Sequence, residues 1–206
     1  MPDARTHDAL TVATGAALAP VTYSFFSGQL LLAHGEAMAA TLWLVGAHMV
    51  SGILFSPDLD LDSAIDNRWG IFHWIWRPYM WALPHRHFWS HSLIFAPLLR
   101  LAYFYFVVSG LLFLWVWLLA QLGVVVPDYH LRLYERVRAT LAAHPETTVT
   151  VLVGFCTGSA VHSLADWLVT GGRRFLRLFG VRVVRDYGDH DDSIHRRRRR
   201  ARRAAF

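Results

Sequence analysis

The chain has 206 residues, of which 54% are hydrophobic and only 17% are charged. This length suits one domain or one membrane bundle, and the single cysteine excludes an internal disulfide. Four stretches contain no Asp, Glu, Lys or Arg: residues 9–35, 37–57, 101–127 and 147–165. Each is about long enough to cross a hydrocarbon core of ~30 Å. A soluble protein would place charges along its exposed helix faces, so the pattern favours a membrane protein over a soluble all-helical one.

The first two apolar runs, residues 9–33 and 37–55, predict two antiparallel helices, because only three residues separate them. Pro57 is predicted to end the second helix, since the residue before a proline is disfavoured in the α region. His48 lies near the middle of the second run. We interpret it as a residue that forms hydrogen bonds between helices.

A polar and aromatic connection, residues 58–91, follows the second helix. Its tryptophan and tyrosine residues lie beside Arg68 and Arg77. This composition is typical of a segment in the headgroup region of a membrane. An aromatic cluster packed on the helical bundle is an alternative that is compatible with the first interpretation.

The third apolar run, residues 92–126, would be ~52 Å long as one helix, which is too long for a straight span. Pro97 and Arg100 interrupt its first third, so one long projecting helix and two short helices are both possible. We expect residues 127–146 to form a polar loop with a short surface helix.

The fourth apolar run, residues 147–168, contains Gly154 and Gly158. Small residues at this spacing let two helices approach closely. Together, the four runs predict an all-α fold in which residues 1–170 form a polytopic membrane bundle of about four transmembrane helices that binds metal. The aromatic connection would lie at the membrane interface.

Residues 171–206 hold 12 Arg and four Asp, and we expect them to form a disordered cytoplasmic tail. Four spans then place both termini on the cytoplasmic side of a bacterial inner membrane. We interpret the Arg run first as a determinant of topology. Contact with anionic lipid headgroups, at ~1 kcal/mol per Arg, is the alternative, and nucleic-acid binding is disfavoured. The sequence gives no indication of oligomeric state.

Histidine and aspartate residues from four separate segments fall at one end of this bundle. They are His7 and Asp8 before the first span, Asp58, Asp60 and Asp62 after the second, His85, His87 and His91 before the third, and His162 and Asp166 in the fourth. His162 and Asp166 are four residues apart and share one helix face. Imidazole and carboxylate groups together suit Zn, Mn, Fe or Ni better than Ca or Mg. This convergence predicts a metal site, whereas a hydrogen-bonded His–Asp pair and a solvated turn are the ordinary alternatives.

At these residues the sequence resembles a family of uncharacterised prokaryotic membrane proteins described as metal-binding. The matching pieces, within residues 5–168, are Arg5-Thr6-His7-Asp8, Pro57-Asp58-Leu59-Asp60, the stretch 68–79, His85-Arg86 with Ser90-His91, and His162 with Ala165-Asp166. More distantly, the Asp58 and His91 elements look like those of membrane-bound metal-dependent hydrolases of bacterial inner membranes. The resemblance implies the following metal ligands: His7, Asp58, His85, His91, His162 and Asp166. His87 matches it less well, although its spacing to His91 would suit a helix.

The distant resemblance implies an enzyme that hydrolyses a phosphoester or lipid-like substrate at the cytoplasmic membrane face. We expect Zn as the metal, with Mn or Fe as alternatives. Asp60 would act as general base or further ligand, and Arg86 would neutralise an anionic substrate group. Two non-enzymatic hypotheses stay open: a structural metal that holds the helix ends together, and a metal transporter. Clustering of the candidates at one face weakens the transporter hypothesis.

Overall fold

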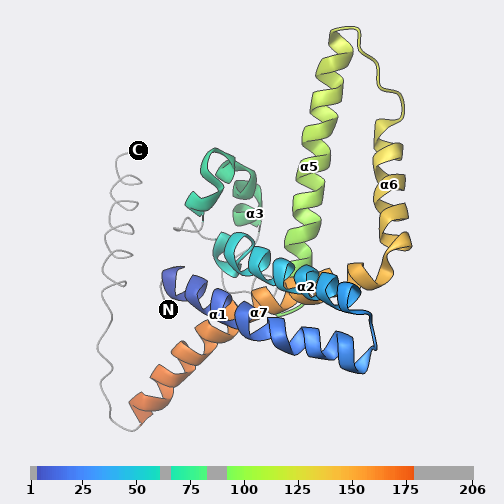
Figure 1. Cartoon of the computed structure of the whole chain (residues 1–206). Coiled ribbons are helices and arrows are strands. Elements are labelled where there is room, and N and C mark those ends of the chain that lie inside the picture. Colours follow the sequence, from blue (N-terminus) through green and yellow to red (C-terminus); the bar gives the residue numbers. More distant parts are fainter. Residues whose placement is uncertain (1–3, 61–65, 83–91, 179–206) are drawn as a thin grey trace, which may run out of the picture. The chain divides into compact units, whose positions relative to one another are not determined.

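The computed structural model describes residues 4–60, 66–82 and 92–178, without the side chains of residues 4, 58, 60, 66, 67 and 170–178. These residues form helices and turns and no strand, which confirms the all-α prediction. The elements are α1 (Ala4–Ser24), a π-helical turn η1 (Phe25–Gln29), α2 (His34–Leu54), the 3-10 helices η2 (Pro57–Asp60) and η3 (Asp66–Trp76), α3 (Arg77–Ala82), α5 (Phe95–Gln121), α6 (Tyr129–Ala143) and α7 (Pro145–Leu178) (Figure 1). One compact unit spans Ala4–Leu164, and the end of α7 from Ala165 belongs to a second.

Four segments in the described part of the chain are long and apolar enough to cross a membrane: Arg5–Gln29, His34–Leu54, Phe95–Gln121 and Pro145–Val169. The third run forms one helix of 27 residues, which confirms the alternative of one long helix over that of two short helices. Its length is ~40 Å at ~1.5 Å per residue. Before it, Ser92 Oγ accepts a hydrogen bond from the Phe95 N–H at 3.2 Å.

Helix ends differ from the sequence prediction at several places: the first helical segment stops at Gln29 instead of residue 33, and two other ends extend beyond the apolar runs. α1 begins at Ala4 instead of residue 9, and the described part of α7 continues to Leu178 instead of ending at residue 168. Both extensions have the same cause: an uncharged run marks the apolar part of a helix, and polar residues at either end extend the helix beyond it. His7 therefore lies on α1 itself. Residues 179–206, the rest of the predicted tail, lie outside the described residues.

Glycines bring α2 and α7 into close contact. A Cβ atom at Gly154 would collide with the carbonyl oxygen of Leu44, and a Cβ atom at Gly158 would collide with that of His48. Because no side chain fits at either position, the backbones of the two helices approach more closely than larger residues would allow. The predicted contact at these two glycines is confirmed.

The buried imidazole of His48 joins α1, α2 and α7. Its Nε2 lies 3.2 Å from the Thr11 carbonyl oxygen and 3.0 Å from Thr14 Oγ1 on α1. Its Nδ1 lies 3.1 Å from Thr157 Oγ1 on α7. The predicted role of this histidine in hydrogen bonding between helices is confirmed. Nearby, a Cβ atom at Gly52 would collide with the Thr11 side chain, so α1 and α2 are also in close contact.

An aromatic core lies where the connection packs against α2, α5 and α7. Phe55 meets the rings of Trp69, Trp76 and Phe155 with centroids 5.3–5.5 Å apart. Such edge-to-face contacts are favourable because ring edges and faces carry opposite partial charges. Other large side chains of the connection are exposed: Ile71, Phe72, Trp74 and Trp81. The predicted packing of an aromatic cluster on the bundle is thus confirmed. The location of the connection at a membrane interface stays a prediction.

We predict that Gly158→Ala destabilises the protein by about 1–3 kcal/mol, because the added methyl group meets the backbone of α2. Thermal denaturation in detergent micelles, followed by circular dichroism, measures the effect. Gly110→Ala in α5 is the matched control, since a Cβ atom there meets nothing within 4 Å. Alanine is the better helix former, so the control keeps or raises the Tm. An equal Tm for both variants would contradict the close contact.

Candidate metal centre

The end of α2 is held by side chains from other segments. A helix leaves its last four carbonyl groups without partners inside the helix. Three N–H donors cap carbonyl groups here: Arg68 Nη1 to Ile53 O at 2.7 Å, Trp69 Nε1 to Leu54 O at 3.0 Å, and Arg100 Nη1 to Phe55 O. Two of these donors are guanidinium groups. Their positive charge also suits the negative end of the helix dipole.

Each of the two guanidinium groups that cap α2 also forms a bond to a further helix. Arg68 Nη2 forms an ion pair of 2.7 Å with Asp8 Oδ2 on α1. Arg100, which is completely buried, donates a hydrogen bond of 3.3 Å to Ser159 Oγ on α7. The end of α2 therefore fixes the beginning of α1 and this turn of α7 at one place.

Two imidazole rings stack where α1 and α7 are held in this way. His7 lies on α1 and His162 lies on α7. Their ring centroids are 3.7 Å apart, with 16° between the ring planes. Both are almost completely buried, with exposed fractions of 2% and 1%. Thr11 Oγ1 donates to the His7 carbonyl oxygen at 2.9 Å, and Ser56 Oγ shares a hydrogen bond of 3.3 Å with His162 Nδ1. The structure thus brings together two histidines from the first and the last predicted spans.

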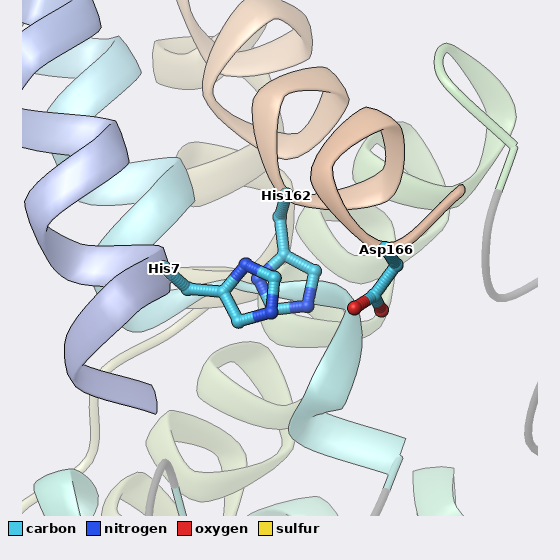
Figure 2. Close-up of side chains that lie close together, drawn as sticks. All are labelled: His7, His162 and Asp166. Atoms are coloured by element: carbon cyan, nitrogen blue, oxygen red, sulfur yellow. The ribbon is translucent and has the colours of Figure 1, made fainter. Parts of the chain in front are cut away.

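Asp166 adds a carboxylate to this pair. It follows His162 by four residues on the unbroken helix α7, which places both side chains on one helix face. It is also buried, with 8% of its surface exposed. One ligand atom from each of His7, His162 and Asp166 lies within 4.8 Å of the others, and the carboxylate lies beside the imidazole rings (Figure 2).

This donor set fits a divalent transition metal. Zn²⁺ binds imidazole nitrogen and carboxylate oxygen at ~2.0–2.2 Å, whereas Ca²⁺ and Mg²⁺ prefer oxygen ligands alone. Ligand atoms around a tetrahedral zinc ion are ~3.3 Å apart at those bond lengths. Donor atoms within 4.8 Å of one another can reach that spacing by small side-chain rotations. A buried carboxylate requires a cation or hydrogen bonds beside it, which also suits a metal position.

The other predicted site residues fall partly outside the described structure. Asp58 and Asp60 lie in η2, directly after the capped end of α2, but their side chains are not described. His85, Arg86 and His91 lie outside the described residues. Their assignments as ligands or catalytic groups remain predictions.

Three residues that hold the site together were not among those predicted from the sequence: Ser56, Arg68 and Arg100. Arg100 offered a usable signal, because it is a lone charge within an apolar run. Ionisable residues within such runs are usually buried, paired or functional. Ser56 and Arg68 offered no comparable signal, since their roles depend on contacts with α7 and α1 that sequence spacing does not show.

A family model described as "Uncharacterized metal-binding protein (DUF2227)" matches residues 2–176 of the chain. The chain belongs to this family. The match covers α1 through most of α7 and includes all three clustered side chains. Membership in DUF2227 supports metal binding, and the family description specifies neither the metal nor a reaction. No curated protein and no solved structure matches the chain.

For this DUF2227 protein we predict that Ser56→Ala weakens metal binding by about 10–100-fold, because groups that orient a ligating histidine have effects of this size. Titration of the purified protein against a chelating metal indicator measures the dissociation constant. Ser51→Ala is the matched control, since Ser51 is also a buried serine near the end of α2. If both variants bind the metal as tightly as the wild type, Ser56 does not orient a ligand.

Proposed function

We propose that the protein is an integral protein of the bacterial inner membrane that binds a divalent transition metal, foremost Zn²⁺, through His7, His162 and Asp166. The observation that carries this proposal is the stacked, buried imidazole pair contributed by the first and last candidate spans. A single buried histidine is commonly a packing residue. Two histidines with a carboxylate in reach match the ligand set of a zinc site.

The proposed membrane location is supported by the four candidate spans and by the surface of α5. In this helix the large side chains Phe106, Phe113, Trp115 and Trp117 are more than half exposed. Exposure of such an apolar surface to water is unfavourable, whereas lipid acyl chains would cover it. The arginines of the C-terminal segment support cytoplasmic termini, which would put the metal centre near the cytoplasmic headgroups.

The finer proposal is that this centre hydrolyses a phosphoester, with lipid-like substrates favoured by its position. A catalytic zinc site has three protein ligands and an open position, whereas a structural site has four. A bound divalent metal supplies a Lewis acid for the phosphoryl oxygens and an activated water. Asp60 would take one proton of the attacking water as the water oxygen bonds to phosphorus, the ester P–O bond would break, and the proton would pass to the leaving alcohol oxygen. Arg86 binds the negative charge of the phosphate.

We predict that the purified wild-type protein carries transition metal and that His7→Ala and His162→Ala lose most of it, because each removes one of few ligands. Elemental analysis of protein purified in detergent measures the metal content. His130→Ala is the control, because His130 is exposed on α6 and outside the clustered ligands. Circular dichroism and the conservative variants His7→Gln and His162→Gln separate ligand loss from misfolding.

Unchanged metal content in folded His7 and His162 variants would remove this site. His91→Ala and Asp58→Asn extend the same measurement to the ligands predicted from the sequence alone. Loss of metal in either would add that residue to the ligand set.

If the centre is a hydrolase, metal-loaded protein releases alcohol and inorganic phosphate from a phosphomonoester, or an alcohol and a phosphomonoester from a phospholipid in mixed micelles. Removal of the metal by a chelator abolishes the activity, and added Zn²⁺, Mn²⁺ or Fe²⁺ restores it. Asp60→Asn keeps the metal and loses the turnover, because it removes the general base. Protein with a full metal complement that hydrolyses none of these substrates would instead favour a structural metal that holds the helix ends together.

A further inference from the structure

Helix α6 carries an apolar stripe that is mostly exposed among the described residues, with Leu133 half-buried. None of its 15 residues is buried. Leu133, Val137 and Leu141 follow one another at four-residue spacing and therefore form one row along the helix, with Tyr134 beside them. Tyr134, Val137 and Leu141 are 56%, 36% and 49% exposed.

The charged residues of α6 lie outside this row. They are Arg132, Glu135, Arg136 and Arg138, three cations against one acid. At ~100° per residue, Arg136 and Arg138 flank the apolar stripe on its two sides. An Arg side chain in such a position covers apolar surface with its stem and keeps its charge in the polar layer. An apolar stripe with a basic polar face is typical of a helix that lies in the plane of a membrane surface.

The place of α6 in the chain agrees with such a location. It connects α5 and α7, two of the four candidate spans. A segment that connects two successive spans begins and ends at the same membrane face. Gly123 and Asp128, with φ values of 82° and 51°, allow the backbone to turn between α5 and α6. Because α5 begins near the metal centre at Arg100, its other end leads to the opposite face.

We propose that α6 lies in the plane of the membrane surface opposite the metal centre and binds anionic lipid. Leu133, Val137 and Leu141 would enter the acyl-chain boundary, and the arginines would contact phosphate headgroups. This inference rests on the membrane insertion in the proposed function. A second copy of the chain is the other occupant that the stripe would accept. Symmetric pairing of two stripes would bring the flanking arginines of both copies together, so the charges favour anionic lipid.

Spin labelling of the full chain in lipid nanodiscs tests the proposal. Cys156 is the only cysteine and is replaced by serine, and a nitroxide is attached at one new cysteine in Val137→Cys, Glu135→Cys or Leu114→Cys. Collision rates with oxygen, which enters lipid, and with a water-soluble nickel chelate report the surroundings of each label. In nanodiscs with anionic lipid we expect the label at position 137 to favour oxygen severalfold over the label at position 135. The label at position 114, within α5, reports the span itself and favours oxygen most.

The outcomes separate this inference from the proposed function. Nickel access at all three positions overturns membrane insertion and, with it, the inference. Equal nickel access at positions 135 and 137, with a lipid-exposed label at position 114, overturns the inference alone. A label at position 137 that neither reagent reaches, broadened by a second nitroxide, identifies a second copy as the occupant and also overturns it. Two further measurements test the requirement for anionic lipid: nanodiscs of zwitterionic lipid, and the joint substitution of Arg132, Arg136 and Arg138 by Gln. The requirement is contradicted if either leaves the oxygen preference at position 137 unchanged.

Discussion

The carbonyl groups at the end of α2 are the constraint on which the candidate metal centre depends. Ser56-Pro57 prevents the helix from continuing, so these groups need donors from elsewhere. Arg68 and Arg100 supply two of them, and each extends to a further helix. Asp8 on α1 and Ser159 on α7 are the second partners. The same bonds that satisfy α2 therefore bring His7 and His162 together.

A second set of contacts fixes the same three helices nearer the middle of α2. Gly158 brings α7 against the backbone of α2, and the His48 imidazole reaches Thr11 on α1 and Thr157 on α7. Helices held at two levels have little freedom to rotate about their axes. The histidine pair is consequently oriented by backbone packing as well as by its own hydrogen bonds, as a preorganised ligand set requires.

Local patterns in the sequence predicted much of this arrangement. Uncharged runs predicted the long helices, and Pro57 predicted the end of α2. The spacing of Gly154 and Gly158 predicted a close helix contact, which the structure places between α2 and α7. The alternation of membrane faces placed His7 and His162 at one end. These features depend on helix length and periodicity, which short stretches of sequence determine.

Other features depend on contacts between distant segments. No spacing in the sequence shows that Arg68 reaches both α2 and Asp8, or that Ser56 meets His162. Helix ends were also misplaced, because α1 begins before its uncharged run and α7 continues beyond its own. The remaining predicted ligands after α2 and before α5 belong to segments whose side chains the structure does not describe, so the ligand set there still rests on the sequence.

In the proposed site, one metal ion is shared by the first and last candidate spans. X-ray absorption fine structure at the metal edge of the purified, metal-loaded protein tests it most directly. For a shared ion we expect nitrogen and oxygen neighbours at ~2.0–2.2 Å, the scattering pattern of at least two imidazoles, and one imidazole fewer in His7→Gln and in His162→Gln. Sulfur at ~2.3 Å, or an imidazole count that neither substitution changes, would contradict it.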